Sequence, residues 1–376
     1  MKRVKFQQHQ SVDTHEGRRA QILEQYPEVK KLMIIEERTK YIIGATVMLQ
    51  LACSVLSTWI QDSVAFCLFS YVFGATISHS LFLAIHETTH NSCCKSLSGN
   101  QWLGILANLP IVIPYSATFR RYHLFHHHKL GLELDCDIPT NFECFWISYS
   151  SLNYVDHCLR KALYLSMYTV VYAVRPLLLH PEIFRADAWF ATNVVCQLAF
   201  NALLYHLHGM KPFYYLLLST FLAGSLHPFS GRFLAEHLVV ENGFETYSYY
   251  GRFNTFFFYK VGAHTEHHDF PGMPWSQLDK LRQIAPEFYC NRPQTPGWLD
   301  TTMQFIFDDS IGPANRIIRS HETSEEKVDT GNDLHLAKSL IESVDAHDVR
   351  NHKKQDKEQR DQCFQRTKSS MEPVDS

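Results

Sequence analysis

Residues 64–90 read VAFCLFSYVFGATISHSLFLAI-HETTH, an uncharged run that ends directly before two histidines. A run of this length without charge can cross the hydrocarbon core of a bilayer as a helix. His86 and His90 are four residues apart, so both imidazoles would lie on one face of that helix. This stretch therefore predicts a membrane span that carries metal-binding side chains at its end.

Two further histidine clusters repeat this spacing. They place histidines at i, i+3 and i+4, and they read His123-Leu-Phe-His126-His127 and His264-Thr-Glu-His267-His268. Neutral imidazole is the commonest protein ligand for transition metals. The eight imidazoles of the three clusters exceed what one ion can use, so we predict a site for two metal ions at a membrane surface.

The composition narrows the class of partner. The 376 residues carry 35 Lys and Arg against 38 Asp and Glu, a balance that indicates no nucleic-acid partner. The ten cysteines include no CxxC pair, which favours a reduced chain that faces the cytosol. The first residues contain neither an apolar signal-peptide core nor Gly at position 2, so we expect no secretory cleavage and no myristoylation.

Four uncharged runs are candidates for membrane spans. A short polar turn separates the first from the second and the third from the fourth, so they form two hairpins. The runs are residues 41–60, 64–85, 189–207 and 213–229, and the turns are residues 61–63 and 209–211.

Prolines and polar residues mark places where an apolar stretch is not a plain span. Two prolines interrupt residues 101–119, which predicts a broken or re-entrant element. An Arg-Pro pair interrupts residues 163–179, which predicts an interfacial segment or a short hairpin. Asn193, Gln197 and Asn201 form a stripe on the third span, and we expect this stripe to face neighbouring helices or substrate rather than lipid.

The charge distribution predicts the orientation. Residues 1–40 contain nine Lys or Arg, whereas the turns at 61–63 and 209–211 contain one between them. The positive-inside rule then places the N-terminus in the cytosol and both turns in the lumen. With two hairpins, all three histidine clusters and the C-terminus lie on the cytosolic side.

The predicted architecture is all-α, with about four transmembrane helices, additional interfacial helices and a cytosolic cap that holds two metal ions. Three segments follow from the change in composition along the chain. Residues 1–40 form a cytosolic N-terminal segment, residues 41–319 the membrane domain and residues 320–376 a polar cytosolic tail without stable structure.

One more histidine and several carboxylates are candidates for the metal site. His237 follows the last span on the side of the clusters, so we predict it as a ninth ligand. His79, His128 and His227 are weaker candidates. Four carboxylates next to predicted ligands are candidates for orienting the imidazoles or are simply solvated: Glu87, Glu236, Glu266 and Asp269.

A different enzyme class also matches part of the pattern. His86-Glu87-Thr-Thr-His90 fits the HExxH signature of zinc proteases, in which the glutamate is the general base. An intramembrane zinc protease would leave the second and third clusters without a role, as would a zinc-binding scaffold. The spacing by itself does not choose between iron and zinc, because imidazole suits both.

The chain resembles the membrane fatty-acid desaturase and hydroxylase superfamily, whose HxxxH, HxxHH and HxxHH boxes match all three clusters. More narrowly it resembles the sphingolipid Δ4-desaturases, over about residues 14–320. The stretches that carry this resemblance are Arg18-Arg-Ala-Gln-Ile-Leu-Glu-Gln-Tyr-Pro27, Ala107-Asn-Leu-Pro-Ile111, Pro114-Tyr-Ser116, Asp137-Ile-Pro-Thr140, Glu245-Thr-Tyr-Ser-Tyr-Tyr-Gly251 and His264-Thr-Glu-His-His-Asp-Phe-Pro271.

The resemblance implies a non-haem di-iron enzyme of the endoplasmic reticulum membrane. Such an enzyme uses O₂ and electrons from NADH, delivered by cytochrome b5 reductase and cytochrome b5, to introduce a trans 4,5 double bond into dihydroceramide and so form ceramide. The eight box histidines and His237 would hold the iron. No His-Pro-Gly-Gly haem motif is present, so cytochrome b5 would be a separate protein.

An enzyme of this architecture could also form a second product. Hydroxylation at carbon 4, which yields phytoceramide, shares its first step with desaturation, and an enzyme of this kind could carry out both. The chain also departs from the family at two positions outside the boxes, where Arg232 and Phe244 replace the usual histidines. These departures leave the predicted metal ligands intact and concern the position of the substrate.

Overall fold

The computed structural model describes residues 7–9, 14–147, 153–238 and 244–319. Helices dominate this part of the chain, and its single strand pairing is the short parallel pair of β1 (Gln7–His9) and β2 (Ile317–Arg319). The helical fold class predicted from the sequence is therefore confirmed. The predicted polar tail, residues 320–376, lies outside the described residues.

Three helical segments are long and apolar enough to cross a membrane, and they confirm the predicted spans at 41–60, 64–85 and 189–207. The first comprises α2 (Thr39–Leu56) and η2 (Ser57–Trp59). The second comprises α3 (Ser63–Phe69), η3 (Ser70–Ala75) and α4 (Thr76–Thr89), and the third is α10 (Ala188–His208). The fourth predicted run is helical only as α11 (Met210–Ala223), because the chain turns at Gly224 and Ser230 caps the turn through the carbonyls of Ser225 and His227.

A π-helical turn, η3, lets the second span pack closely against α11. A Cβ atom built on Gly74 would lie 2.0 Å from Ser219 Oγ, so only glycine permits this approach. The Gln50 side chain of α2 donates a 3.1 Å hydrogen bond to the Gly74 carbonyl within this π-helical turn. Close helix contact and a satisfied backbone are thus achieved together.

The proline-containing run at 101–119 is broken, as the sequence predicts. Helices α5 (Leu97–Asn108) and α6 (Ser116–Lys129) meet at 115°, with η4 (Leu109–Ile111) between them. Asn108 forms hydrogen bonds with backbone groups at the break. Its side-chain oxygen accepts from two backbone N–H groups, and its amide nitrogen donates 2.7 Å bonds to the Ile113 carbonyl and to Gln197. The predicted polar stripe of α10 therefore faces neighbouring helices.

The interrupted run at 163–179 forms two helices that meet at 73°, α8 (Tyr154–Ser166) and α9 (Tyr168–Leu179). Arg175 lies inside α9 and is buried. Its guanidinium forms an ion pair with Glu143 of α7 (Asn141–Ile147), with a shortest N–O distance of 2.6 Å. The arginine that interrupts the apolar run thus fixes α9 to the chain that follows the second histidine cluster.

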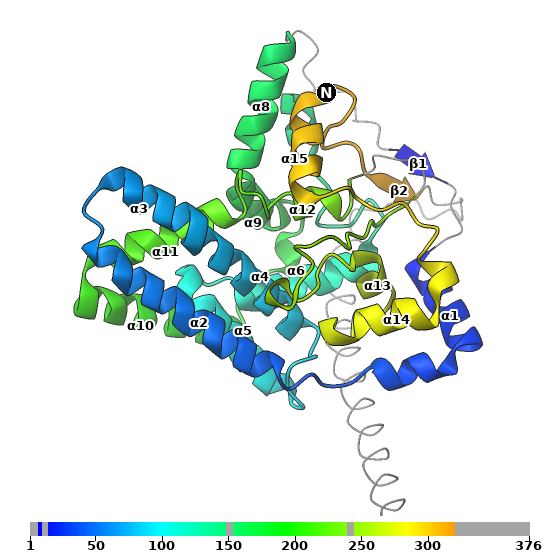
Figure 1. Cartoon of the computed structure of the whole chain (residues 1–376), viewed down its shortest axis with the longest axis horizontal. Helices are drawn as coiled ribbons and strands as arrows, with labels where there is room; N and C mark the ends of the chain where they lie inside the picture. Colours follow the sequence, from blue (N-terminus) through cyan, green and yellow to red (C-terminus); the bar gives the residue numbers. More distant parts are fainter. Residues whose placement is uncertain (1–6, 10–13, 148–152, 239–243, 320–376) are drawn as a thin grey trace, which may run out of the picture.

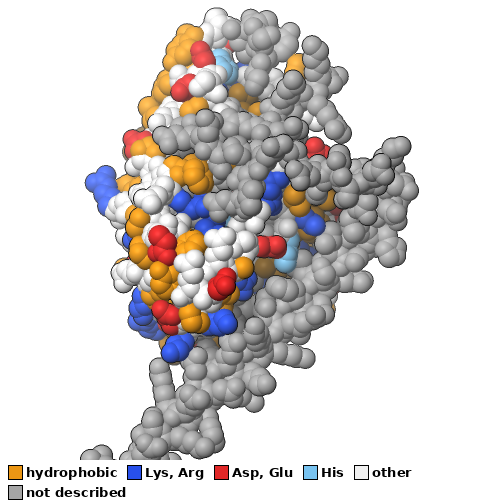
Figure 2. Space-filling model, turned by 90° about the vertical axis from the view of Figure 1, so that its right-hand side faces the viewer, with side chains coloured by type: hydrophobic (Ala, Val, Ile, Leu, Met, Phe, Trp, Pro, Cys, Tyr) orange, Lys and Arg blue, Asp and Glu red, His pale blue; other side chains and the backbone are white. Residues whose placement is uncertain are grey.

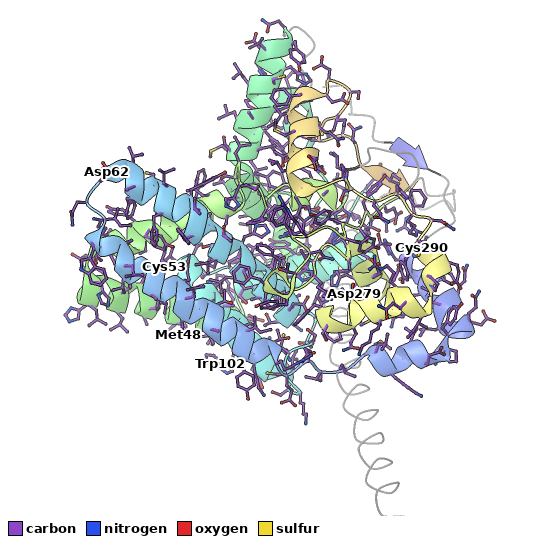
Figure 3. All side chains as sticks on the ribbon, viewed as in Figure 1. Met48, Cys53, Asp62, Trp102, Asp279 and Cys290 are labelled. Carbon is purple, nitrogen blue, oxygen red and sulfur yellow. The ribbon has the colours of Figure 1, made fainter. Side chains whose placement is uncertain are left out.

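The two predicted lumenal turns lie at one end of the molecule. Lys211, after α10, donates hydrogen bonds to the carbonyls of Ile60 and Thr58 beside the first turn. Helices α2, α3, α10 and α11 extend together to this end on the left of Figure 1. Asp62 marks the tip of the first turn in Figure 3, whereas Asp279 and Cys290 lie on the opposite side of the molecule.

The opposite end of the molecule contains a separate apolar core. Ile22 and Val29 of the N-terminal segment pack with Phe270, Leu281 and Tyr289. Figure 2 shows that this face carries Lys, Arg, Asp and Glu side chains among hydrophobic ones. The elements at this end are α1 (His15–Gln25), η1 (Pro27–Leu32), α13 (His264–Asp269), α14 (Leu278–Ile284) and η8 (Pro286–Phe288). Four others contribute to the core of the spans instead: α12 (Arg232–Ala235), η6 (Phe256–Phe258), η7 (Trp275–Gln277) and α15 (Trp298–Phe307). The short η5 (Pro181–Ile183) precedes α10.

Candidate metal centre

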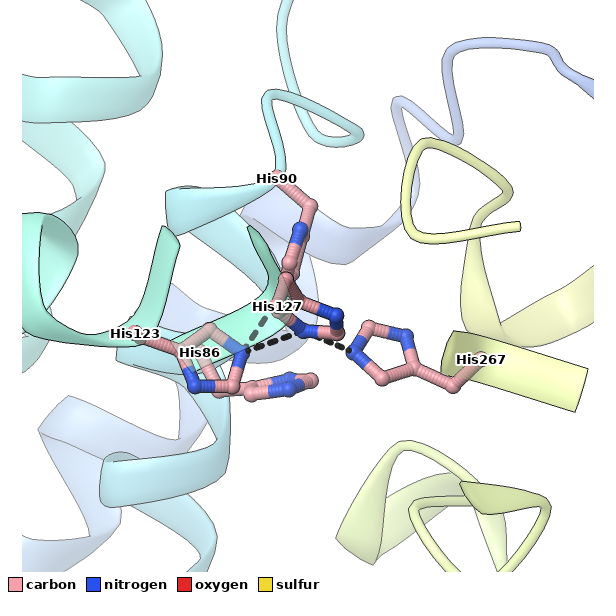
Figure 4. A group of neighbouring side chains, drawn as sticks. All are labelled: His86, His90, His123, His127 and His267. Atoms are coloured by element: carbon pink, nitrogen blue, oxygen red, sulfur yellow. Dashed lines mark hydrogen bonds between the residues drawn. The ribbon is translucent and has the colours of Figure 1, made fainter. Parts of the chain in front are cut away.

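Three helices bring the histidine clusters together at the end of the second span. The first cluster occupies the last turn and C-cap of α4, the second lies on α6 and the third forms α13. Figure 4 shows imidazoles of all three clusters converging. Of the eight cluster histidines and His237, all are buried except His127, which is partly exposed.

Five imidazoles form the first group, and their candidate ligand atoms all lie within 4.8 Å of one another. Three Nε2–Nε2 contacts link four of them: His90 to His123 at 2.9 Å, His123 to His127 at 3.0 Å and His127 to His267 at 3.1 Å. His86 completes the group, which therefore draws ligands from all three clusters.

The second group lies beside the first. It contains His126, His237 and His268, again with candidate ligand atoms within 4.8 Å of one another. His264 adjoins it, because its Nε2 lies 3.0 Å from Nε2 of His237 and its ring centroid lies 4.4 Å from that of His268. The structure thus brings together all nine histidines predicted as ligands.

The two adjacent histidines at the end of each HxxHH cluster belong to different groups. His126 and His127 separate in this way on α6, and His267 and His268 separate on α13. Successive residues of a helix point about 100° apart, so a doublet can serve two neighbouring sites. This division explains why paired histidines are useful in a centre with two ions.

The nitrogen geometry fits metal ions better than a hydrogen-bond network. Nε2 of His123 faces two other Nε2 atoms, and so does Nε2 of His127. A neutral imidazole nitrogen carries either one hydrogen or one lone pair, so it cannot make two linear hydrogen bonds. Ligands about 2.1 Å from an ion and 90° apart have nitrogens about 3 Å from each other, close to the observed spacing.

The second group contains a further unsatisfied atom. Nε2 of His268 is buried and has no hydrogen-bond partner within the described residues.

Burial affects the pKa values of histidines in both groups. It lowers the pKa of His267, in the first group, to about 3. It also lowers the pKa values of His237, His264 and His268, in or beside the second group, well below the usual value. These imidazoles are therefore neutral at pH 7, which leaves a lone pair for a metal ion.

Oxygen atoms hold two imidazoles of the second group through Nδ1. Nδ1 of His126 lies 2.8 Å from Oδ1 of Asp135, and Nδ1 of His237 lies 3.1 Å from the backbone carbonyl of Glu245. Such bonds fix the tautomer and turn Nε2 toward the ion. Sequence reasoning missed Asp135, although its position in Asp-Cys-Asp-Ile-Pro, shortly after the second cluster, was a usable signal.

The four carboxylates predicted to orient imidazoles have different surroundings. Glu87 and Glu236 lie near predicted ligands, with oxygens 3.5 Å from Nδ1 of His86 and 3.8 Å from Nδ1 of His264. Glu266 accepts hydrogen bonds from Ser248 and Tyr250, and Asp269 accepts from Arg18 and Tyr289 and contacts His15. The last two thus connect α13 to neighbouring segments.

The N-terminal segment supports the third cluster from outside. Arg18 donates two hydrogen bonds, of 2.6 and 2.8 Å, to the Asp269 carboxylate at the end of α13. His15 contacts the same carboxylate at 2.6 Å, and its ring centroid lies 5.2 Å from that of His268. The segment before the first span therefore helps to position α13, a role that sequence reasoning did not assign to it.

The weaker histidine candidates lie outside both groups. His79 accepts a hydrogen bond from Arg232 at 3.1 Å, and its Nδ1 lies 3.1 Å from the Ala223 carbonyl. His227 packs against Tyr71. His128 is exposed at the end of the second cluster.

A cavity adjoins the histidines. Five predicted ligands contribute to its lining: His86, His123, His126, His237 and His264. Apolar and aromatic side chains line most of the rest, including Phe82, Phe119, Ile111 and Phe233. Such a surface suits a hydrocarbon chain that passes the metal groups.

Family models and relatives agree with this geometry. A model described as fatty acid desaturase matches residues 62–295, and one described as sphingolipid Delta4-desaturase matches residues 6–38. The Mus musculus protein named sphingolipid delta(4)-desaturase/C4-monooxygenase DES2 is 39% identical over 318 residues, covering 83% of this chain and 94% of that protein. The Homo sapiens sphingolipid delta(4)-desaturase DES1 is 40% identical over 316 residues, with 83% and 93% coverage. The chain belongs to the sphingolipid Δ4-desaturase family.

Membership in the sphingolipid Δ4-desaturases establishes a membrane-bound lipid desaturase, an oxidoreductase. A plant relative, the Oryza sativa subsp. japonica protein named sphingolipid delta(4)-desaturase DES1-like, is 39% identical over 311 residues and covers 82% of this chain and 90% of that protein. The fatty acid desaturase match contains all three histidine clusters, and the sphingolipid Δ4-desaturase match contains α1. The HExxH interpretation as a zinc protease loses its basis, because His86 and His90 group with histidines of the other two clusters.

Proposed function

We propose that the protein introduces a trans double bond between carbons 4 and 5 of dihydroceramide and so forms ceramide. The observation that carries this proposal is the convergence of nine histidines in two groups, five of which line an apolar cavity. The names of the relatives support the choice of a sphingolipid substrate.

Two iron ions are the proposed cofactors, one for each histidine group. Bound iron would supply the redox chemistry with O₂ that the attack on an unactivated methylene needs and that zinc cannot provide. The residues that would hold it are His86, His90, His123, His127 and His267 in the first group, and His126, His237, His264 and His268 in the second.

The reaction balances with an external reductant. Loss of one hydrogen from carbon 4 and one from carbon 5 takes two electrons from the lipid. Two more electrons, from NADH through cytochrome b5 reductase and cytochrome b5, complete the reduction of O₂ to two water molecules. The protein's part is to hold the chain against the histidines and exclude water from it, for which the aromatic wall of the cavity is suited.

The location we propose is the endoplasmic reticulum membrane, with the N-terminus and the histidines on the cytosolic side. In Figure 1 the turn between α10 and α11 lies at the left, away from α6 and α13, which carry the second and third histidine clusters, and this separation supports the orientation. Glycosylation acceptor sites inserted at residues 61–63 and before residue 14 test it, since only the first should be modified. Modification of the N-terminal site would reverse the orientation.

The first experiment is expression in yeast that lacks its own sphingolipid carbon-4 hydroxylase, followed by mass spectrometry of the sphingoid bases. The expected product is a 4,5-unsaturated base, absent from cells that express His123→Ala. Phytosphingosine alone would reject desaturation in favour of hydroxylation. Neither product, with the protein present and loaded with iron, would reject both activities.

Hydroxylation at carbon 4 is the second candidate function. It is favoured by the name of the Mus musculus relative, which combines desaturase and C4-monooxygenase. The same yeast profile measures both products, and a mixture would identify a bifunctional enzyme.

The metal content tests the two-ion proposal separately. Purified protein should contain two iron ions per chain by elemental analysis. His126→Ala and His127→Ala alter neighbouring residues of different groups, so each should lower the content toward one. Two zinc ions and no iron would contradict the proposed redox chemistry.

A further inference from the structure

The cavity beside the histidines contains few charged groups. Apart from histidines, the charged side chains that line it are Asp137, Arg232 and Glu236. Arg232 donates a 2.7 Å hydrogen bond to Glu236, so these two opposite charges neutralise each other. Asp137 is the remaining charge, and its partners lie outside the cavity lining.

Asp137 is held firmly by two arginines. Its Oδ2 accepts a 2.9 Å hydrogen bond from Arg316, and its backbone carbonyl accepts a 3.1 Å bond from Arg175. Its backbone N–H donates to Asp135, the residue that contacts His126. These contacts fix the carboxylate relative to the second histidine group and keep it ionised.

One oxygen of this fixed carboxylate has no hydrogen bond. Oδ1 of Asp137 is buried and, within the described residues, accepts none. Nη1 of Arg175 lies 3.5 Å from this oxygen and donates to the backbone carbonyl instead. A buried carboxylate oxygen without a donor is costly, so its presence beside the cavity calls for an explanation, and a donor on a bound ligand supplies one.

The proposed substrate carries matching donors. Its sphingoid base has hydroxyl groups on carbons 1 and 3, and carbon 3 is bonded to carbon 4, where the reaction begins. A donor this close to the reacting carbon must enter the same cavity when carbon 4 reaches the histidines. An ionised carboxylate is a strong acceptor for an O–H group.

We propose that Oδ1 of Asp137 accepts a hydrogen bond from a hydroxyl group of the sphingoid base and so sets the depth at which the lipid enters the cavity. Asp137 is then a substrate-positioning residue that selects sphingolipids over simple acyl chains. This inference rests on the proposed sphingolipid substrate. It also gives the Asp137-Ile-Pro-Thr140 motif a role beyond the metal ligands.

The test compares Asp137→Asn with Glu143→Gln. Glu143 pairs with Arg175 in the same buried ion-pair cluster but does not line the cavity, so its variant is the structural control. Binding of radiolabelled dihydroceramide and of analogues that lack the hydroxyl on carbon 1 or on carbon 3 is measured with purified full-length protein in lipid nanodiscs. Turnover of each lipid is measured in parallel.

Asp137→Asn should weaken the binding of dihydroceramide roughly tenfold or more, while one analogue binds equally to wild type and variant. The insensitive analogue identifies the hydroxyl that Asp137 recognises. Glu143→Gln should change binding of all three lipids by one common factor. An equal loss on all three lipids for Asp137→Asn, or no loss on any, would overturn the proposal.

The binding readout separates this inference from the proposed function. Wild-type protein that binds dihydroceramide in a hydroxyl-dependent way but forms no product would contradict the proposed reaction and still support the role of Asp137. Wild-type protein that binds all three lipids with equal affinity would contradict the role of Asp137 even if ceramide is formed.

Discussion

The bundle of spans and the histidine end satisfy their buried polar groups in different ways. In the bundle, Gln50 donates to Gly74 and Ser78, and Asn108 donates to Gln197, so protein groups serve one another. At the histidine end, Nε2 atoms of His123 and His127 each face two others, and Nε2 of His268 has no partner within the described residues. The bundle thus pairs Gln50 and Asn108 within the protein, whereas the histidine end has an arrangement of nitrogens that is compatible with bound metal ions.

The largest expected effect comes from removing one ligand. His123→Ala should lower activity at least about a hundredfold, because loss of a metal ligand costs more than loss of a group that orients one. Membrane insertion and expression should remain, since the apolar spans fix the fold. The measurement is ceramide formation in isolated membranes at equal protein level.

His128→Ala is the matched control for that change. His128 lies at the end of the same cluster but in neither histidine group, so the variant should keep wild-type activity. Equal inactivation of both variants would show that the helix, not the ligand, was damaged.

Metal removal should destabilise the histidine end selectively. Ions that bind only the folded state stabilise it, so chelation should reduce the free energy of unfolding by roughly 2 kcal/mol or more, a fall of about 5 °C in Tm. Hydrogen–deuterium exchange should increase in α6, in α13 and in the last turn of α4, which carry the histidines, and stay constant in α2 and α11. Uniform protection with and without metal would show that the histidine end does not depend on ions.

Asn108→Leu tests the self-sufficiency of the bundle. The change removes four hydrogen bonds at the break between α5 and α6, including that with Gln197, and should cost about 2 kcal/mol of stability. Asn201→Leu, one helical turn from Gln197, removes the bond to the Val112 carbonyl and the contact with Gln197 and should cost less. Unfolding in mixed micelles measures both, and a larger loss for Asn201→Leu would contradict this account of the break.

The smallest expected effect on stability concerns the contact between the start of the first span and the segment after the first histidine cluster. Glu36 precedes α2, and its backbone N–H donates to the Ser92 carbonyl after the first histidine cluster. Hydrogen bonds from Arg38 lower the pKa of Glu36 from 4.5 to about 2. The stabilisation is therefore present above pH 4.5 and disappears as the pH falls toward 2.

Glu36→Gln should be less stable than wild type by about 1 kcal/mol at pH 7, because the exposed Arg38 is screened by solvent. The difference should shrink between pH 4.5 and 2. Denaturant unfolding at pH 7, 4 and 3 measures it, and a constant difference across this range would exclude the ion pair as its source.

Local patterns predicted most of the fold and the histidines that the structure brings together. Uncharged length predicted three spans, the prolines predicted the break in 101–119, and i, i+3 and i, i+4 spacing predicted the histidine faces. These features depend on residues within a few turns of one another. Such features can therefore be predicted from the sequence alone.

Contacts between segments that are brought together only by the fold could not be predicted from local patterns. The separation of each histidine doublet into two groups depends on where three helices meet, and the contact of Asp135 with His126 depends on the turn after α6. The 213–229 run has the composition of a span, yet α11 ends at Ala223 because the chain turns there. Tertiary packing, not local preference, decides these features.

The ion pair between Arg18 and Asp269 has a consequence for how the protein is made. Its two residues are 251 positions apart, so the ribosome must synthesise nearly the whole membrane domain before they can meet. At roughly 5–20 residues per second, this interval lasts on the order of 10–50 s. During that time the first two histidine clusters already exist without the third. Loading of the proposed ions would therefore be a late event in biogenesis, completed only when the last part of the membrane domain folds back onto the N-terminal segment.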